Sequence, residues 1–110
     1  MTTLINPKHI SWVNPQQGTD QNGNLTAWDP STDMKGIELQ FDGGTPIEVD
    51  CGFVTSFDMS TLDAYKALAS GAHTVDIAIL TKEGVLGGFS VQQTFSIGVA
   101  PLVPTAVDLS

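Results

Sequence analysis

The sequence predicts a small all-β domain built as an antiparallel sandwich. Apolar residues occupy alternate positions in residues 36–41 and again in residues 71–79, and a period of two is typical of strands with one buried face. A Gly43-Gly44 pair follows the first of these segments, where a tight turn is expected. With 110 residues, the chain is long enough for one domain with a single core.

Turn residues divide the chain into short extended segments. Strands are expected at residues 8–13, 25–28, 36–41, 46–50, 53–57, 71–79 and 89–97. The first has Ile10 and Trp12 on one face, and Trp12 is expected in the core. Residues 16–33 are polar and rich in turn residues, which predicts a long exposed loop containing only a short edge strand.

One short helix is expected before the penultimate strand. Ser60 has the side chain of an N-cap residue, and Gly71 is placed to end the helix. Leu62, Tyr65 and Leu68 fall on one helical face between them. The expected length is about two turns.

The last two strands alternate between a buried and a solvated face, as antiparallel strands do. The residues expected to face inward are Val75, Ile77, Ile79, Phe89, Val91, Gln93, Phe95 and Ile97. Asp76 belongs to the opposite, solvated face. Gln93 needs a hydrogen-bonding partner if it is buried.

The charge balance excludes one large class of partner. The chain has twelve acidic residues, four lysines and no arginine, which gives a formal net charge of −8. Binding to phosphate requires clustered Lys or Arg, so we expect no nucleic acid partner and no anionic membrane partner. Residues 1–4 lack a basic segment followed by an apolar run, and we expect neither a signal peptide nor a membrane anchor.

Candidate metal sites are weak. Residues 20–24 carry oxygen ligands at alternate positions, as calcium loops do, but Ser31 stands where an EF-hand has glutamate. A solvated turn is the simpler interpretation. His9 and His73 are far apart in the sequence and lack neighbouring ligands at zinc spacing. The single Cys51 is expected to be a partly buried apolar residue.

No catalytic arrangement is visible either. The sequence contains no Gly-x-Ser-x-Gly nucleophile turn. Glu48 and Asp50 share one strand face, which is more simply a solvated sheet surface than an acid and base pair. We expect no enzymatic activity and no cofactor.

Three segments are candidates for contact with a partner. Trp28 lies beside Asp29 in the polar loop, where an exposed aromatic ring can stack on a sugar or anchor a protein contact, although local packing in the loop is the alternative. The glycine-rich residues 84–88, including Gly87, form a second candidate loop. The third is the Pro-containing C-terminal tail, residues 99–110, in which Leu102, Val103 and Val107 are apolar.

Three motifs resemble the fibronectin type III and bacterial Ig-like superfamily. These are Ile-Ser-Trp-Val-Asn-Pro at residues 10–15, the Asp-Gly-Gly turn at 42–44 with Thr-Pro after it, and Ser-Gly-Ala-His-Thr-Val-Asp-Ile at 70–77. The resemblance covers roughly residues 8–97. Two departures stand out: the usual tyrosine of the penultimate strand is absent, with His73 nearby, and the usual first strand is shortened to residues 3–7.

The resemblance implies an Ig-like sandwich over residues 1–98 and a separate tail over 99–110. It also implies a binding or structural role, such as a bacteriophage accessory protein that decorates the capsid or tail of a virion and aids attachment to the host. The expected partners are viral capsid or tail subunits, with weak glycan binding and a homo-oligomer formed through the tail as further expectations. The alternative is an extracellular carbohydrate-binding or adhesin module from a longer secreted protein. Fold alone does not decide between these roles.

Overall fold

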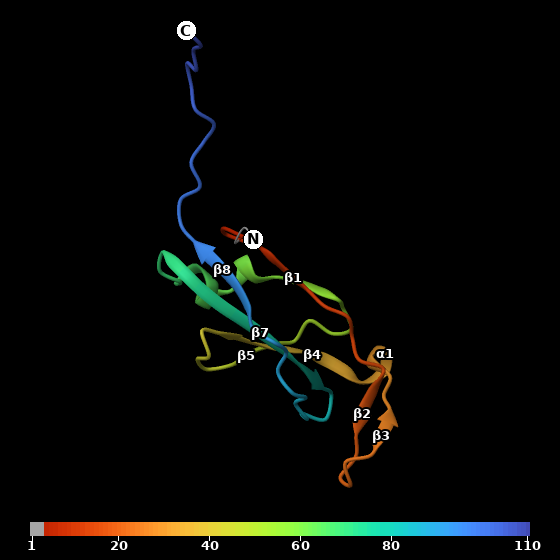
Figure 1. Ribbon diagram of the computed structural model, residues 1–110. Coiled ribbons are helices and arrows are strands. Elements are labelled where there is room, and N and C mark those ends of the chain that lie inside the picture. Colours follow the sequence, from red (N-terminus) through yellow and green to blue (C-terminus); the bar gives the residue numbers. More distant parts are fainter. Residues whose placement is uncertain (1–3) are drawn as a thin grey trace.

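A computed structural model describes residues 4–110 of the chain (Figure 1). The strands are β1 (His9–Ser11), β2 (Gln17–Thr19), β3 (Leu25–Ala27), β4 (Met34–Phe41), β5 (Ile47–Val49), β6 (Ser56–Asp58), β7 (Gly71–Thr81) and β8 (Gln93–Ile97). The helices are α1 (Pro30–Asp33), the 3-10 helix η1 (Met59–Thr61) and α2 (Asp63–Lys66). The protein is therefore mainly β, as the sequence predicts.

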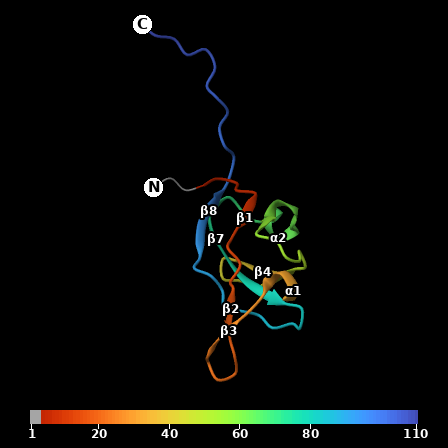
Figure 2. The same cartoon turned by 90° about the vertical axis from the view of Figure 1, so that its right-hand side faces the viewer.

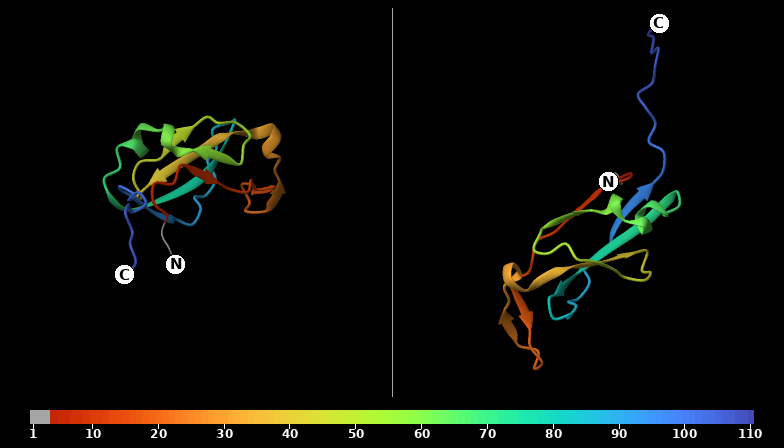
Figure 3. Two further views of the ribbon diagram at one scale, coloured as in Figure 1. Left: turned by 90° about the horizontal axis from the view of Figure 1, so that it is seen from above. Right: turned by 180° about the vertical axis from the view of Figure 1, so that it is seen from behind.

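The strands form three antiparallel sheets. The largest has four strands in the order β5-β4-β7-β8, and β4 and β7 form its long central pair. A second sheet consists of β1 and β6, and a third is the hairpin of β2 and β3. Seen from above, β1 passes over the long central strands (Figure 3, left).

The core lies on one face of the four-stranded sheet. Its buried residues are Met34, Ile37, Leu39, Phe41, Val49, Met59, Val75, Ile77 and Phe95. Residues of the β1–β6 sheet and of η1 and α2 pack against this cluster, Ile10, Phe57 and Tyr65 among them. Trp12 also packs there and is half-buried, with its indole Nε1 donating to Asn14 Oδ1 at 2.7 Å.

The turn after β4 is confirmed. Asp42 and Gly43 both have positive φ, 55° and 67°, and the Gly44 amide donates to the Phe41 carbonyl at 2.9 Å. Two consecutive residues with positive φ define the turn type that suits a hairpin, and glycine adopts it without strain. The chain therefore returns as β5, which pairs with β4 through Leu39 and Ile47.

The predicted two-turn helix is wrong in its detail. The chain forms η1 and the single-turn α2 instead, separated by Leu62, whose ψ of 135° is extended. Asp58 rather than Ser60 is the N-cap, because its carboxylate accepts from the Ser60 amide at 2.9 Å. Gly71, expected to end the helix, begins β7.

The predicted last strand is too long. Only β8 is regular, and the residues before it contact β7 at separate points, which include the isolated bridge between Leu80 and Leu86 and the hydrogen bond from the Ser90 amide to the Ile77 carbonyl. From Leu86 to Gln93 the chain takes seven steps opposite five on β7, so the ladder is interrupted and the alternation is lost. Val91 is consequently 81% exposed, and Gln93 is exposed rather than buried.

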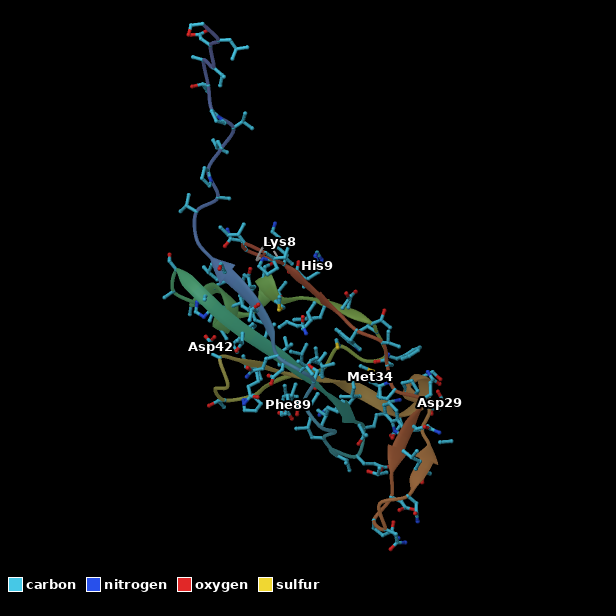
Figure 4. The ribbon with its side chains drawn as sticks, in the orientation of Figure 1. Lys8, His9, Asp29, Met34, Asp42 and Phe89 are labelled. Carbon is cyan, nitrogen blue, oxygen red and sulfur yellow. The ribbon has the colours of Figure 1, made fainter. Side chains whose placement is uncertain are left out.

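Phe89 was also expected to face the core, and this prediction is wrong. It is 37% exposed, and it lies on the side of the four-stranded sheet away from His9 of β1 (Figure 4). Phe95 and Ile97 of β8 do point toward the core, as expected. The core face therefore ends with the regular part of the strand.

Asp76 is not solvated as the alternation predicts. It is only 7% exposed, and its Oδ1 atom is buried without a hydrogen-bond partner among the described residues. Residues 87–90 run beside this part of β7, with the amides of Gly87 and Ser90 donating to the carbonyls of Ile79 and Ile77. Because residues 87–90 come from later in the chain, the alternation of apolar residues around Asp76 gives no sign of their presence beside β7.

Residues 16–33 are more ordered than a long loop. They contain the β2–β3 hairpin, whose tip is the turn at residues 20–23, followed by α1. Figure 2 shows this hairpin extending from one end of the body. The expected edge strand at 25–28 is present as β3, and the extended segment expected at 53–57 is shifted to β6.

The C-terminal segment, residues 99–110, leaves the opposite end of the body. It extends away from β8 in every view (Figures 1 to 3), and all of its residues are exposed. The whole molecule measures 71 × 26 × 21 Å. No helix in the described part of the chain is long and apolar enough to cross a membrane.

Candidate functional site

A pocket of about 250 Å³ lies where the β2–β3 hairpin meets the end of β7. Its lining residues come from four separate segments: Pro15, Gln17, Gly18, Thr19, Trp28, Ile79, Thr81, Val85, Leu86 and Gly87. We call this the Trp28 pocket. It brings together two residues that the sequence analysis selected separately, Trp28 and Gly87.

Trp28 is held in place by local packing and also lines the pocket. Its indole Nε1 donates to Asp33 Oδ2 at 2.7 Å, and its backbone amide donates to the Gln16 carbonyl at 3.0 Å. The side chain is half-buried and packs against the core. The structure therefore shows the local packing of Trp28 and places the residue in the lining of the pocket; contact with a partner stays a prediction.

Gly87 forms the opposite wall. Its amide donates to the Ile79 carbonyl at 2.9 Å, which fastens the loop to β7. The neighbouring Leu86 is bridged to Leu80, and the Val85 amide donates to the Thr81 hydroxyl at 3.0 Å. Three successive residues of this loop are thus tied to one strand, which makes the pocket a preformed feature.

Asp29 has a local role. Its Oδ1 accepts from the Ser31 amide at 3.0 Å and from the Ser31 hydroxyl at 2.7 Å, and this contact caps the N-terminus of α1. Asp29 is not among the residues that line the pocket.

The tail residues are not brought to the pocket. Leu102, Val103 and Val107 are 92%, 86% and 76% exposed. None of the backbone hydrogen bonds found outside helices and strands in residues 4–110 involves the C-terminal segment. The candidate contact residues therefore divide into a pocket at one end of the body and an apolar tail at the other.

The carboxylates considered for acid and base chemistry form a surface ion cluster. Lys35 Nζ lies 3.1 Å from Glu48 Oε2 and 3.7 Å from Asp50 Oδ1. The hydrogen bond to Glu48 and the charge of Asp50 raise the pKa of Lys35 above its ordinary value. A solvated sheet surface describes this cluster well.

The candidate calcium loop is a turn closed on itself. Asp20 Oδ1 accepts from the amides of Asn22 and Asn24, at 2.9 and 3.0 Å. Within residues 4–110, no three His, Cys, Asp or Glu residues gather as a group that could hold a metal ion.

A histidine–aspartate pair, His73 and Asp42, lies at the end of the sheet away from the Trp28 pocket, and the sequence did not reveal it. His73 Nδ1 is 2.6 Å from Asp42 Oδ2, and His73 Nε2 is 2.6 Å from the Ala69 carbonyl oxygen. Asp42 lies at the end of the sheet away from Asp29 (Figure 4). Because both ring nitrogens face acceptors, the imidazolium is favoured, and the bonds to Ala69 and Asp42 raise the pKa of His73. The bonds from His73 and from the Thr74 amide lower the pKa of Asp42.

This pair predicts a pH dependence of stability. A raised folded-state pKa of His73 adds stability that is complete below about pH 6.5 and is lost as the pH rises through that raised pKa. A lowered pKa of Asp42 adds stability that is present above its ordinary value of 3.8 and is lost as the pH falls through the lowered one. The free energy of unfolding, measured by denaturant titration, should therefore fall as the pH rises above about 6.5.

The matched control uses the other histidine. His73→Gln should flatten this decline, whereas His9→Gln should leave it in place, because His9 is exposed. An undiminished decline in the His73 variant would assign it to another group.

Comparison with protein-family models, with curated proteins and with solved structures found no match to this chain. The candidate function therefore rests on the residues and on the geometry described above.

Proposed function

We propose that the protein is a non-catalytic Ig-like module that decorates the surface of a virion through its C-terminal segment. The proposed sandwich is supported by strand order. Strands β1 and β6 pair as strands B and E do in an Ig-like fold, and β5, β4, β7 and β8 follow the order C′-C-F-G. The motifs at residues 10–15 and 70–77 agree with this assignment, since the first begins in β1 and the second covers the start of β7.

The C-terminal segment carries the proposal. Its apolar side chains, Val99, Leu102, Val103, Val107 and Leu109, are all exposed. An apolar surface left in water costs free energy that a partner can recover, and such surfaces mark interaction sites. The rest of the chain is strongly acidic and suits display at high density, because like charge prevents nonspecific association.

The proposed partners are capsid or tail subunits of a virus, reached by assembly in the host cytoplasm. An exposed extended segment can dock on a neighbouring protein or add a strand to its sheet. Strands β5 and β8 lie at the edges of the four-stranded sheet and offer further places for contact. No cofactor and no nucleic acid is part of this proposal.

The second candidate function is an extracellular carbohydrate-binding or adhesin module. The Trp28 pocket favours it, because a fixed aromatic ring beside Gln17, Thr19 and Thr81 offers both a stacking surface and hydroxyl or amide partners. This function requires glycan binding that Trp28→Ala abolishes and that Phe53→Ala, an exposed aromatic outside the pocket, leaves intact.

Immunogold electron microscopy tests the proposed function directly. Antibody against the folded domain should label virus particles released from cells that carry the gene. A full-length variant with Leu102→Asp and Val103→Asp should lose the label, because two carboxylates cannot be buried cheaply in an apolar contact. If the antibody label were found only at the cell surface or in the medium, and if the protein bound glycans, virion decoration would be rejected in favour of the adhesin function.

A further inference from the structure

We propose that the C-terminal segment of one copy of this chain binds in the Trp28 pocket of a second copy. The inference rests on the proposed function, in which this segment makes the contact, and it adds one partner: a segment that is not bound to a virion subunit binds a second copy of the chain. Four features of the segment and the pocket carry it.

The first feature is charge. Each copy carries a net charge of −8, so two copies repel one another over most of their surfaces. The ten residues that line the pocket include no charged side chain, and residues 99–107 include none either. Two neutral surfaces on strongly acidic molecules can meet without adding to the repulsion.

The second feature is the spacing of prolines in the segment. Pro101, Leu102, Val103 and Pro104 form a Pro-x-x-Pro sequence. In the polyproline II conformation, which has three residues per turn, the two prolines of such a sequence lie on one face, about 9 Å apart. Segments of this kind bind grooves lined by aromatic residues because little entropy is lost on binding. The Trp28 pocket offers an indole ring beside Pro15, Val85 and Leu86.

The third feature is the shape of the pocket. Its volume of about 250 Å³ is below the roughly 300–1,000 Å³ of typical small-molecule sites, and it suits a few side chains of a peptide. Its walls are already fixed by the bonds of Trp28 to Asp33 and of Gly87 to Ile79. A preformed site loses little entropy when it is filled.

The fourth feature is distance, and it excludes binding within one copy. The segment begins after Gly98, beside Gly71 at the start of β7, whereas the pocket lies at the other end of β7, near Thr81. The ten steps from Gly71 to Thr81 span about 33 Å. Pro104 is six residues beyond Gly98 and reaches about 22 Å at most. The Pro-x-x-Pro sequence therefore cannot reach the pocket of its own chain.

The segment and the pocket lie at opposite ends of the body, so two arrangements are open to this contact. Two antiparallel copies can exchange segments and fill both pockets in a symmetric dimer, or each copy can bind the next in one direction and form a ring or an open chain. Both arrangements use the same contact between the segment and the pocket.

Mixing two full-length variants tests this arrangement. Val85→Asp places a carboxylate in the pocket, and Leu102→Asp places one in the segment; both side chains are mostly exposed, so folding should survive. Sedimentation velocity from micromolar to millimolar concentration should show self-association of the natural chain. Each variant should weaken it by about tenfold or more. A mixture of the two variants should form a one-to-one complex, because one supplies an intact segment and the other an intact pocket.

Val91→Asp is the matched control, since it adds the same charge at an exposed residue outside the pocket lining. It should associate like the natural chain. A natural chain that stays monomeric at every concentration overturns the inference, and so does association that persists in both variants. A mixture that fails to form the complex overturns it too and indicates segment-to-segment or edge-strand pairing. Labelled virus particles with a monomeric chain would keep the proposed function and reject only this inference.

As an independent measurement, a fluorescent peptide of residues 99–110 should bind the Leu102→Asp chain in an anisotropy titration. Binding should weaken about tenfold or more in the chain that also carries Val85→Asp. A peptide with both prolines replaced by alanine should bind more weakly, because it loses its preformed conformation. Equal binding by all of these pairs would contradict the pocket assignment.

Discussion

Leu39→Ala should lower the free energy of unfolding by about 2–5 kcal/mol. Leu39 lies in the middle of β4 with no exposed surface, and its neighbours across the sheet are Ile47 on β5 and Ile77 on β7. Removing its side chain loses buried apolar surface and leaves a cavity, because strands paired on both sides cannot close around it. The total free energy of unfolding of a natural domain is about 5–15 kcal/mol, so this loss is a large fraction of it.

Leu25→Ala is the matched control, because it removes the same atoms from a leucine that is 72% exposed on β3. Its effect should stay within about 0.5 kcal/mol. Urea titrations of both variants, with equal slopes, give the two values. Equal losses from both substitutions would show that Leu39 does not belong to the core.

The central strand β4 was predictable because its pattern and its pairing with β7 are regular from Ile37 to Phe41. There Ile37, Leu39 and Phe41 are buried and the residues between them are not. In β7 the alternation is lost where Asp76 and Ala78 are buried as well. Residues 89–92 have an equally clear alternation, yet the extra residues opposite β7 place Val91 in solvent. A bulge arises from pairing between distant segments, so local periodicity does not reveal it.

The candidate site was predictable only in parts. Trp28 stands out as an aromatic residue in a polar segment, and Gly87 as part of a glycine-rich loop. Their meeting in one pocket depends on how the β2–β3 hairpin packs against β7, for which the sequence contains no local signal. The same is true of His73 and Asp42, whose contact follows from the register of β4 and β7. The sequence signal for this contact is a histidine near the start of one predicted strand and an aspartate just after another, since the two ends meet when the strands pair antiparallel.

Gly36→Ala should be about as damaging as a cavity in the core, at roughly 3 kcal/mol. Gly36 lies in β4 at an irregularity in its pairing with β7, and backbone atoms of Val49 and Cys51 lie close to it. A Cβ atom there would press directly on the Val49 carbonyl oxygen and would lie 2.9 Å from the Cys51 backbone nitrogen. Both are backbone atoms and cannot rotate away, so β5 must shift and its pairing with β4 must weaken.

The single cysteine reports this shift locally. Cys51 is half-buried, and burial raises the pKa of its thiol, which slows reaction with a disulfide reagent. In Gly36→Ala the displaced chain should expose Cys51 and speed the reaction under native conditions. Gly88→Ala is the control, since its added Cβ meets no atom within 4 Å, and both its stability and its thiol reactivity should stay close to those of the natural chain. A Gly36→Ala protein with natural stability but a faster thiol would mean that β5 can leave the edge of β4 at little cost, and the freed edge of β4 would then be the place for an incoming strand to bind.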